Sequence, residues 1–414
     1  MMENLITGAA LADFCAELVR FPSFTGEESH LSEWLAGYFD ARGYQVEMQE
    51  VESGRLQTIA VLKGTGGGSN LMFNGHLDID PLRTGWQRDP FSPVVEGDLF
   101  YGAGARNMKA GVASMVMAAE AVRLSGKRLQ GDLTIACVIG ELQGGVGTTY
   151  ALKHGIDADA AIVPEPVGAG YVVTTTCGVL QFSISTKGFS DHISRKENSA
   201  SAISMMVRII MALEALEFSN VDPVLPGVPR LMVGAVIGGV GESYNMRSAA
   251  HAADICTATV DVRFLPGQTS ESVLVELRGV IDAAGMDIPH FDYDLDFDSR
   301  PPYELNRIVF EPAVLSISEP IVSVVSHASE EIRKLPLEGR GAVAPMSYMG
   351  ADSSHLTRAG IPALLYGPTG PVRNAEDADD CVFISEMVTV SRVLASSAIR
   401  FCGQKQGLHR RQHE

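Results

Sequence analysis

The chain has 414 residues, of which 46% are hydrophobic and 20% are charged, a composition typical of a folded globular protein. One hydrophobic core rarely serves a chain of this length, so we expect two domains. The 32 basic and 50 acidic residues give a net charge of -18. This negative balance argues against nucleic acid and anionic membrane surfaces as partners.

No stretch of the sequence predicts a secretory signal or a membrane span. Residues 1–6 lack a basic segment and an extended apolar run, and no apolar run approaches the ~18 residues that a span needs. The six cysteines are scattered without paired spacing, which favours reduced, buried thiols over disulfides or a zinc knuckle. We therefore expect a cytoplasmic protein.

The first 177 residues predict alternating helices and strands. Apolar residues at spacings of three and four indicate amphipathic helices at 8–20 and 27–42. The further elements expected in this region are strands at 44–51, 58–62, 71–74, 133–139 and 160–163, a hairpin at 94–101, and helices at 108–124 and 147–154. Strands alternating with helices predict an α/β fold with a mostly parallel sheet flanked by helices.

From residue 178 the pattern changes to a smaller α+β domain. The expected elements are strands at 179–186, 231–239, 255–264 and 288–297 and helices at 200–216 and 271–284. This βαββαβ order predicts an antiparallel sheet inserted as residues 178–297. Residues 298–414 then complete the larger domain that begins with residues 1–177. They predict helices at 328–335, 354–359 and 385–401 and a strand at 363–366.

A histidine and an aspartate, His76 and Asp78, follow the apolar run Leu71–Phe73. If that run is a buried strand, the loop at Gly75–Pro81 lies at its carboxyl end, where open α/β sheets build their sites. Four more polar stretches accompany this loop along the chain. They are Gly102–Lys109, Gly140–Gly147, Val163–Pro166, and Gly367–Gly370 followed by Ala375–Asp377.

Together these stretches resemble the co-catalytic zinc family of acetylornithine deacetylase, succinyl-diaminopimelate desuccinylase, aminoacylase and glutamate carboxypeptidase. The resemblance covers nearly the whole chain. It implies a catalytic α/β domain and a smaller lid that often forms the dimer, so we expect a homodimer through residues 178–297. In such enzymes a His and a later carboxylate bind one ion, a Glu and a late His bind another, and an Asp bridges both.

Carried onto this chain, the resemblance places His76 and Glu165 on the first ion and Asp78 behind His76. Glu141 occupies the position of the general base, which activates water and directly precedes the metal-binding Glu of the family. His192, in the segment Gly188–His192, matches a histidine that stabilises the oxyanion. Glu141, Asp78 and His192 are thus the expected catalytic group.

Three positions of the second ion carry different residues. The bridging Asp is Asn107, the Glu beside the base is Leu142, and the late His is Glu376. Leu142 has no donor atom, and a neutral amide is too weak a ligand to hold two divalent ions together. We expect at most one divalent ion, zinc or cobalt, bound by His76 and Glu165, with a metal-free site as the alternative.

Without metal, several carboxyl groups would share one cavity and raise one another's pKa values. These are Asp78, Glu141, Glu165, Asp352 and Glu376. A cationic substrate group, such as an amine or guanidinium, would compensate them. Asn107, Asp352 and Glu376 are therefore expected to contact the substrate. In the insert, the resemblance adds Asn245 and Arg263, the latter as a clamp for a substrate carboxylate.

Three functions fit these residues. The first is an amide hydrolase with one metal that acts on an N-acyl amino acid or dipeptide, using Glu141 as base. The second is a metal-independent enzyme that performs deacylation, acyl transfer or cyclisation on a cationic, amino-acid-like compound. The third is a non-catalytic binding protein, against which the presence of Glu141 argues. In each case the partner is a small amino-acid-like molecule.

Overall fold

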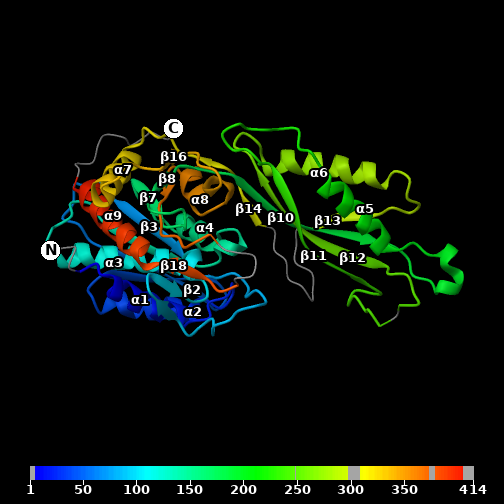
Figure 1. Cartoon of the computed structure of the whole chain (residues 1–414), viewed down its shortest axis with the longest axis horizontal. Coiled ribbons are helices and arrows are strands. Elements are labelled where there is room, and N and C mark those ends of the chain that lie inside the picture. The colour runs from blue at the N-terminus through cyan, green and yellow to red at the C-terminus, as the bar shows by residue number, and fades with distance from the viewer. Residues whose placement is uncertain (1–4, 248, 297–307, 373–377, 404–414) are drawn as a thin grey trace. The chain divides into compact units, whose positions relative to one another are not determined.

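The computed structural model describes residues 5–247, 249–296, 308–372 and 378–403 (Figure 1). It divides into two compact units: the first comprises residues 1–175, 313–346 and 351–414, and the second comprises residues 176–312 and 347–350. The sequence places its first domain boundary after residue 177. Its second boundary, after residue 297, lies outside the described residues.

An eight-stranded sheet forms the centre of the first unit, in the order β1-β2-β6-β3-β7-β17-β8-β16. Its strands are β1 (Gln45–Glu52), β2 (Arg55–Leu62), β3 (Leu71–His76), β6 (Leu133–Val138), β7 (Ala160–Val163), β8 (Tyr171–Val173), β16 (Gly339–Gly341) and β17 (Ala363–Leu365). The central strands β6, β3, β7 and β17 run parallel, whereas β1, β2 and β6 pair antiparallel. The predicted α/β class with a mostly parallel sheet is confirmed.

Helices pack on this sheet in two groups. The helices are α1 (Gly8–Val19), α2 (Ser29–Asp40), α3 (Ala110–Leu124), α4 (Val146–Lys153), α7 (Pro320–Arg333), α8 (Ser353–Arg358) and α9 (Ile384–Cys402). In one group α3 contacts α1 and α9, and α9 contacts α7; in the other α2 and α4 contact β1, and α4 contacts α8. Every residue of β3 and β6 is buried, as expected for parallel strands covered on both sides.

Several predicted boundaries are wrong. Strand β3 extends past residue 74 to His76, because Gly75 and His76 continue the ladder with Cys137 and Val138 of β6. Helix α7 starts at Pro320 rather than at residue 328, since a proline fits the first turn, where its missing N–H is not needed. The strand expected from residue 288 is β13 and begins at Tyr293.

The hairpin predicted at residues 94–101 is present as two short antiparallel strands, β4 (Val94–Glu96) and β5 (Leu99–Tyr101). A third strand, β18 (Cys381–Phe383), pairs with β5. Nothing in the local sequence pattern predicts β18, because it is three residues long and its partner lies far away in the chain. This pairing brings the segment after residue 377 next to the loop that follows His76.

The second unit is an antiparallel sheet with two helices. Its elements are β10 (Gly178–Lys187), α5 (Ala202–Glu214), β11 (Arg230–Gly239), β12 (Ile255–Phe264), α6 (Ser270–Gly285), β13 (Tyr293–Asp296) and β14 (Ile308–Phe310). The strand order is β11-β12-β10-β13, with β14 also on β10. Alternate residues of β12 are buried in a core shared with α5 and α6. The predicted βαββαβ order is confirmed.

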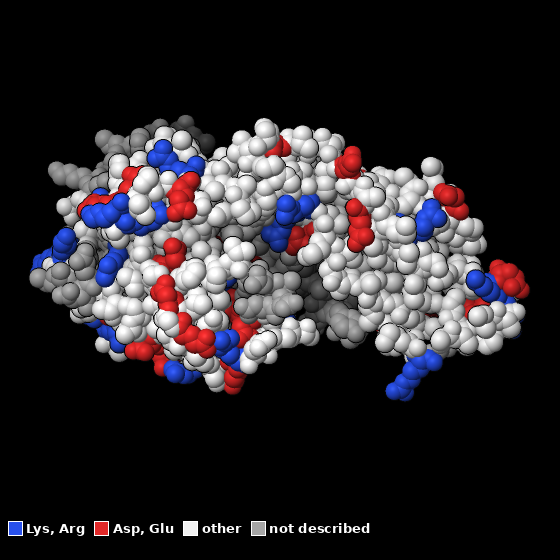
Figure 2. Space-filling view, viewed as in Figure 1, with Lys and Arg blue, Asp and Glu red and all other residues white. Residues whose placement is uncertain are grey.

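All six cysteines are buried and none forms a disulfide, as their scattered spacing predicts. Figure 2 shows acidic and basic side chains interspersed on one face of the described residues. Within the described part of the chain, no helix combines the length and apolar character needed to cross a membrane.

Candidate active site

Three site residues lie where adjacent parallel strands end. His76 is the last residue of β3, and Glu141 and Glu165 follow β6 and β7, the two strands that pair with β3. The carboxyl ends of parallel strands meet at one edge of a sheet, so residues far apart in sequence come together there. After β6, Gly140 takes a φ of 64°, which favours glycine, and turns the chain into a short helical turn at Glu141–Gln143.

The side chains of these loops surround the His76 ring. Its Nε2 lies 3.3 Å from Asn107 Oδ1, 3.9 Å from Glu165 Oε1 and 4.0 Å from Glu141 Oε2. His76, Glu141 and Glu165 are each at most 7% exposed. The structure therefore brings together four residues that the sequence assigned to one site.

Asp78 is fully buried and organises this cluster from behind. Its backbone carbonyl is 2.9 Å from His76 Nδ1, and its carboxylate accepts the backbone N–H groups of Glu141 at 3.1 Å and Leu142 at 2.9 Å. Thr25 Oγ1 donates a weaker bond at 3.3 Å. The sequence groups Asp78 with the catalytic residues, but these contacts make it a positioning residue for His76 and for the base.

His76 and Asp78 shift each other's pKa values in opposite directions. Burial alone would lower the pKa of His76, but Asp78, Glu141 and Glu165 together raise it well above its usual value. Burial would likewise raise the pKa of Asp78, but His76 and the two backbone N–H groups lower it. A protonated His76 ring would donate from Nε2 to the Asn107 carbonyl, whereas a neutral ring can present Nε2 to an ion.

The remaining carboxyl groups bind protons more tightly than usual. Burial raises the pKa of Glu141 well above its usual value; His76 opposes this, and Glu165 and Asp352 add to it. Burial raises the pKa of Glu165 to about 7 and that of Asp352 to about 6, with His76 again opposing. Asp352 is 1% exposed, and its charge adds to the raised pKa values of Glu141 and Glu165. Its contact with the substrate stays a prediction.

The donor atoms available to a metal ion are few. Two ligands of a tetrahedral ion lie about 3.4 Å apart, close to the separations between His76 Nε2 and its neighbours Asn107 and Glu165. The Leu142 side chain has no donor atom, and the Leu142 backbone N–H is bound to Asp78. In the described ranges, no three His, Cys, Asp or Glu side chains are grouped to hold an ion. Glu376 lies outside the described residues.

The turn that carries Glu141 has an anchor that the motifs do not indicate. Arg55 of β2 donates from Nη1 to Gln143 Oε1 at 2.6 Å and forms an ion pair with Glu28, whose side chain is fully buried. The same guanidinium also binds Glu52. Arg55 precedes Gln143 by 88 positions, so only the antiparallel pairing of β1, β2 and β6 brings it to this turn.

Three expected site residues belong to the second unit. His192 Nδ1 accepts the backbone N–H of Ser194 at 3.2 Å, which leaves the proton of the neutral ring on Nε2, available to donate. Asn245 Oδ1 accepts the backbone N–H two residues on, so part of this amide stabilises its own turn. Arg263 forms a two-pronged ion pair with Asp261 at 2.7 and 2.9 Å, so this clamp already holds a carboxylate.

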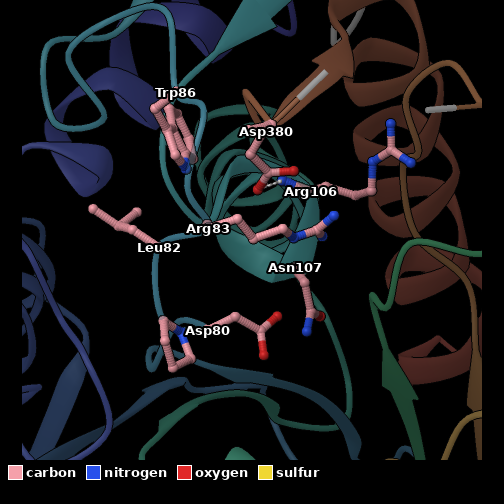
Figure 3. A pocket seen from close by; sticks show the side chains of 10 residues that line it. Asp80, Leu82, Arg83, Trp86, Arg106, Asn107 and Asp380 are labelled. Carbon is pink, nitrogen blue, oxygen red and sulfur yellow. Dashed lines mark hydrogen bonds between the residues drawn. The ribbon is translucent and has the colours of Figure 1, made fainter. Parts of the chain in front are cut away.

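A pocket of about 180 Å³ opens beside Asn107 (Figure 3). Among its walls, the sequence assigns a role only to Asn107, although Asp80, Pro81, Gly104 and Arg106 lie in the same polar stretches. Asp80 continues the alternation His76-x-Asp78-x-Asp80, a signal that could have pointed to it, whereas nothing local indicates Arg83. The residues lining the pocket are Asp80, Pro81, Leu82, Arg83, Trp86, Gly104, Arg106, Asn107, Ala378 and Asp380.

Comparison with known proteins gives both a family and specific relatives. The family model described as peptidase family M20/M25/M40 matches residues 72–400. An N-formyl-4-amino-5-aminomethyl-2-methylpyrimidine deformylase from Bacillus subtilis is 27% identical over 402 residues, covering 91% of this chain and 90% of the relative. A succinyl-diaminopimelate desuccinylase from Xanthobacter autotrophicus is 25% identical, covering 93% and 98%.

Solved structures share the fold at lower identity. Human carnosine dipeptidase 1 has a TM-score of 0.76 at 11% identity, covering 98% of this chain and 100% of that one. A dinuclear metal-binding peptidase of the M20 family from Bacillus subtilis has a TM-score of 0.62 at 16% identity, covering 95% and 98%. At these identities the likeness concerns the fold alone.

Proposed function

The chain belongs to peptidase family M20/M25/M40 and is an amide hydrolase, and on this premise we propose that it removes an acyl group from an amino-acid-like amine. The sequence relatives at 25% and 27% identity are a desuccinylase and a deformylase, and both names describe removal of an acyl group from nitrogen. N-acyl amino acids, dipeptides and related amides are thus the proposed substrate class.

The observation that carries this proposal is the placement of Glu141. Its carboxylate lies 4.0 Å from His76 Nε2 in a buried cluster, and burial raises its pKa. A carboxylate with a raised pKa is a stronger base, so Glu141 takes a proton from water while the oxygen attacks the acyl carbon. Glu141 then returns the proton to the nitrogen as the C–N bond breaks, releasing a carboxylic acid and an amine.

Two further groups complete the proposed reaction. The Nε2–H of His192, exposed by the Ser194 bond to Nδ1, is suited to donate to the oxyanion of the tetrahedral intermediate. At most one divalent ion, zinc or cobalt, would be held by His76 and Glu165 with the Asn107 carbonyl. When bound, such an ion would polarise the acyl carbonyl. A second ion does not fit, because Leu142 offers no donor atom.

Turnover of a panel of N-formyl, N-acetyl and N-succinyl amino acids by Glu141→Gln tests the base. We expect a loss of at least about 100-fold in kcat, because the amide cannot accept the proton. Glu27→Gln, an exposed residue at the surface of the same unit, is the matched control and should leave kcat unchanged. Full turnover by Glu141→Gln would mean that the base is assigned wrongly.

Metal analysis of purified protein before and after chelation tests the ion. We expect at most one tightly bound equivalent, lost on chelation together with activity that zinc or cobalt restores. Two tightly bound equivalents would contradict the proposed donor set. Full activity without any metal would instead favour the metal-independent alternative, in which the protonated carboxyls of the cluster act as acids.

The proposal includes a cytoplasmic homodimer formed through the second unit. The six buried thiols, none of which forms a disulfide, suit a reducing compartment. Helix α5 exposes Ile203, Val207 and Met211 at spacings of four, and β11 pairs with β12 alone among the described strands. A Cβ at Gly238 of β11 would lie 2.6 Å from Ile203, so the stripe and the strand edge adjoin.

An exposed apolar stripe beside an unpaired strand edge is typical of an interface between copies. Light scattering on Val207→Glu should show a monomer where the parent chain is a dimer. Val275→Glu on α6, which is 72% exposed, should leave the dimer intact. A monomeric parent chain would remove this part of the proposal.

A further inference from the structure

The pocket beside Asn107 shares this residue with the proposed reaction centre. Asn107 is both a wall of the pocket and a partner of His76 Nε2 at 3.3 Å. The negative charge of Asp80, another wall residue, adds to the raised pKa of Glu165, so Asp80 lies within electrostatic reach of the cluster. The pocket therefore adjoins the cluster at Asn107, on the side where the rest of a substrate held at Glu141 would lie.

Two opposite charges in the pocket have no partner among the residues that the structure describes. Arg83 and Asp80 form no hydrogen bond or ion pair there, not even with each other, and both are exposed. By contrast, Arg88 of the same loop is paired with Glu96 and Asp379. Figure 3 shows the side chains of Arg83 and Asp80 both extending toward Asn107.

The other charged walls are already engaged. Arg106 donates from its guanidinium to the backbone carbonyls of Cys381 and Pro371. Asp380 is 7% exposed and accepts the backbone N–H of Arg106 at 3.1 Å. Arg83 and Asp80 are therefore the two charged groups in the pocket best able to bind a ligand.

The size of the pocket limits that ligand. A cavity of about 150 Å³ holds one benzene ring, so the 180 Å³ here accommodates a short side chain or one ring. Trp86 and Leu82 supply apolar walls, and Trp86 is only half-exposed. The pocket thus combines a cation, an anion and an apolar surface in a small volume.

We propose that this pocket binds the free α-amino acid group of the substrate, with its carboxylate on Arg83, its ammonium on Asp80 and its carbon chain against Trp86. A ligand with only a carboxylate would face Asp80, and one with only an ammonium would face Arg83, so a zwitterion matches both charges. This inference rests on the proposed function, since the amino acid group is part of the hydrolysed amide. It narrows the substrate to an acylated amine that retains a free amino acid group.

Calorimetry that measures the binding of three five-carbon probes to the full chain tests whether the pocket recognises both charges. L-norvaline carries both charges, pentanoate only the carboxylate, and pentylamine only the ammonium. We expect L-norvaline to bind at least about tenfold more tightly than either of the others, because one charge-assisted hydrogen bond is worth ~1.5 kcal/mol or more. Equal affinities for the three probes would overturn the proposal.

Variants of Arg83 and Asp80 test which charged group of the ligand each residue binds. Arg83→Gln should weaken the binding of L-norvaline about tenfold without weakening that of pentylamine, because pentylamine loses only a repulsive charge. Asp80→Asn should likewise weaken the binding of L-norvaline about tenfold without weakening that of pentanoate. Both residues are exposed, so the fold should tolerate these changes. Arg128→Gln and Asp13→Asn, exposed residues outside the pocket lining, are the matched controls. Unchanged L-norvaline binding by both pocket variants would show that the ligand lies elsewhere.

The outcomes separate this inference from the proposed hydrolysis, because binding of the probes needs no turnover. If Glu141→Gln is inactive but Arg83→Gln binds L-norvaline normally, the pocket is assigned wrongly and the hydrolase stands. If Glu141→Gln remains fully active while the preference for L-norvaline depends on Arg83 and Asp80, the pocket stands and the assigned base is wrong.

Discussion

The two halves of the candidate site differ in how their side chains are held. One half contains His76, Asp78 and Glu165. There a single residue, Asp78, contacts His76, Thr25 and the backbone N–H groups of Glu141 and Leu142. In the half that contains Asn107 and Leu142, Asn107 touches His76, and the Leu142 side chain has no polar atom. Leu142 still donates its backbone N–H to Asp78, a contact that any residue except proline can make.

In this site the position of the base therefore does not depend on which residues occupy the metal-ligand positions. The turn with Glu141 is fixed by backbone bonds to Asp78 and by Arg55 on Gln143, and neither depends on the side chain at position 142. Position 142 can therefore carry a leucine, which cannot bind a metal ion, without any displacement of Glu141. The geometry of the acid–base group persists where the donor set for a second ion does not.

Asp78→Asn is expected to have the largest effect, because it acts on the half of the site that contains His76. The amide cannot accept both N–H groups and also stabilise charged His76, so we expect kcat to fall about 100-fold or more. Thr25→Val, which removes only the 3.3 Å contact to Asp78, is the control and should change kcat little. Kinetics that separate kcat from KM check this, and an unchanged kcat for Asp78→Asn would show that the turn is held by other contacts.

The double change Asn107→Asp with Leu142→Glu tests the other half. It supplies two carboxylates where the chain has an amide and an alkyl group, so we expect a second equivalent of zinc to bind at least about tenfold more tightly than to the parent. Elemental analysis and zinc titration measure this. Asn107→Asp with Leu142→Ile adds no ligand at position 142 and should show a smaller gain. Equal second-ion affinity of parent and double variant would mean that the halves do not differ in this way.

Arg55→Gln tests the anchor that both halves share. Loss of the ion pair to buried Glu28 and of the bond to Gln143 should loosen the turn and lower kcat about tenfold, with KM little changed. Arg55→Lys keeps one donor and should recover part of kcat. Arg123→Gln removes a similar pair with Glu120 away from the site and is the control for stability. A change in KM alone would point to a role in substrate binding instead.

The smallest expected effect is on stability as a function of pH. Burial raises the pKa of Glu165 to about 7 and that of Asp352 to about 6, so the folded chain binds these protons more tightly than the unfolded chain. Their contribution to stability is present near pH 4.5 and is lost as pH rises to about 7. Chelated protein should therefore lose a few degrees of melting temperature between pH 5 and pH 8. Glu165→Gln should flatten this slope, and an unchanged slope would contradict the shift.

Local patterns were sufficient for much of the fold. The periodicity of Leu11, Phe14 and Leu18 predicts α1, and the continuous apolar run of β6 predicts a central strand, because burial imposes those spacings wherever the element lies. The start of α7 at Pro320 and the short strands β8, β16 and β18 were not predicted. Elements of three residues are fixed by their partners, as Cys381 is by Tyr101, and carry too little pattern to be identified alone.

By itself the sequence determined the family motifs, the buried strands and the order of His76, Glu141 and Glu165 along the chain, since these depend on residue type and spacing. Only the tertiary structure decided that Arg55 holds the turn of Glu141, that Asp78 acts through backbone N–H groups, and that Arg83 and Asp80 line one pocket with Asn107. The reason is physical: a motif records which donors and charges are present. Distances between loops depend on how parallel strands are ordered in the sheet, which no local spacing encodes.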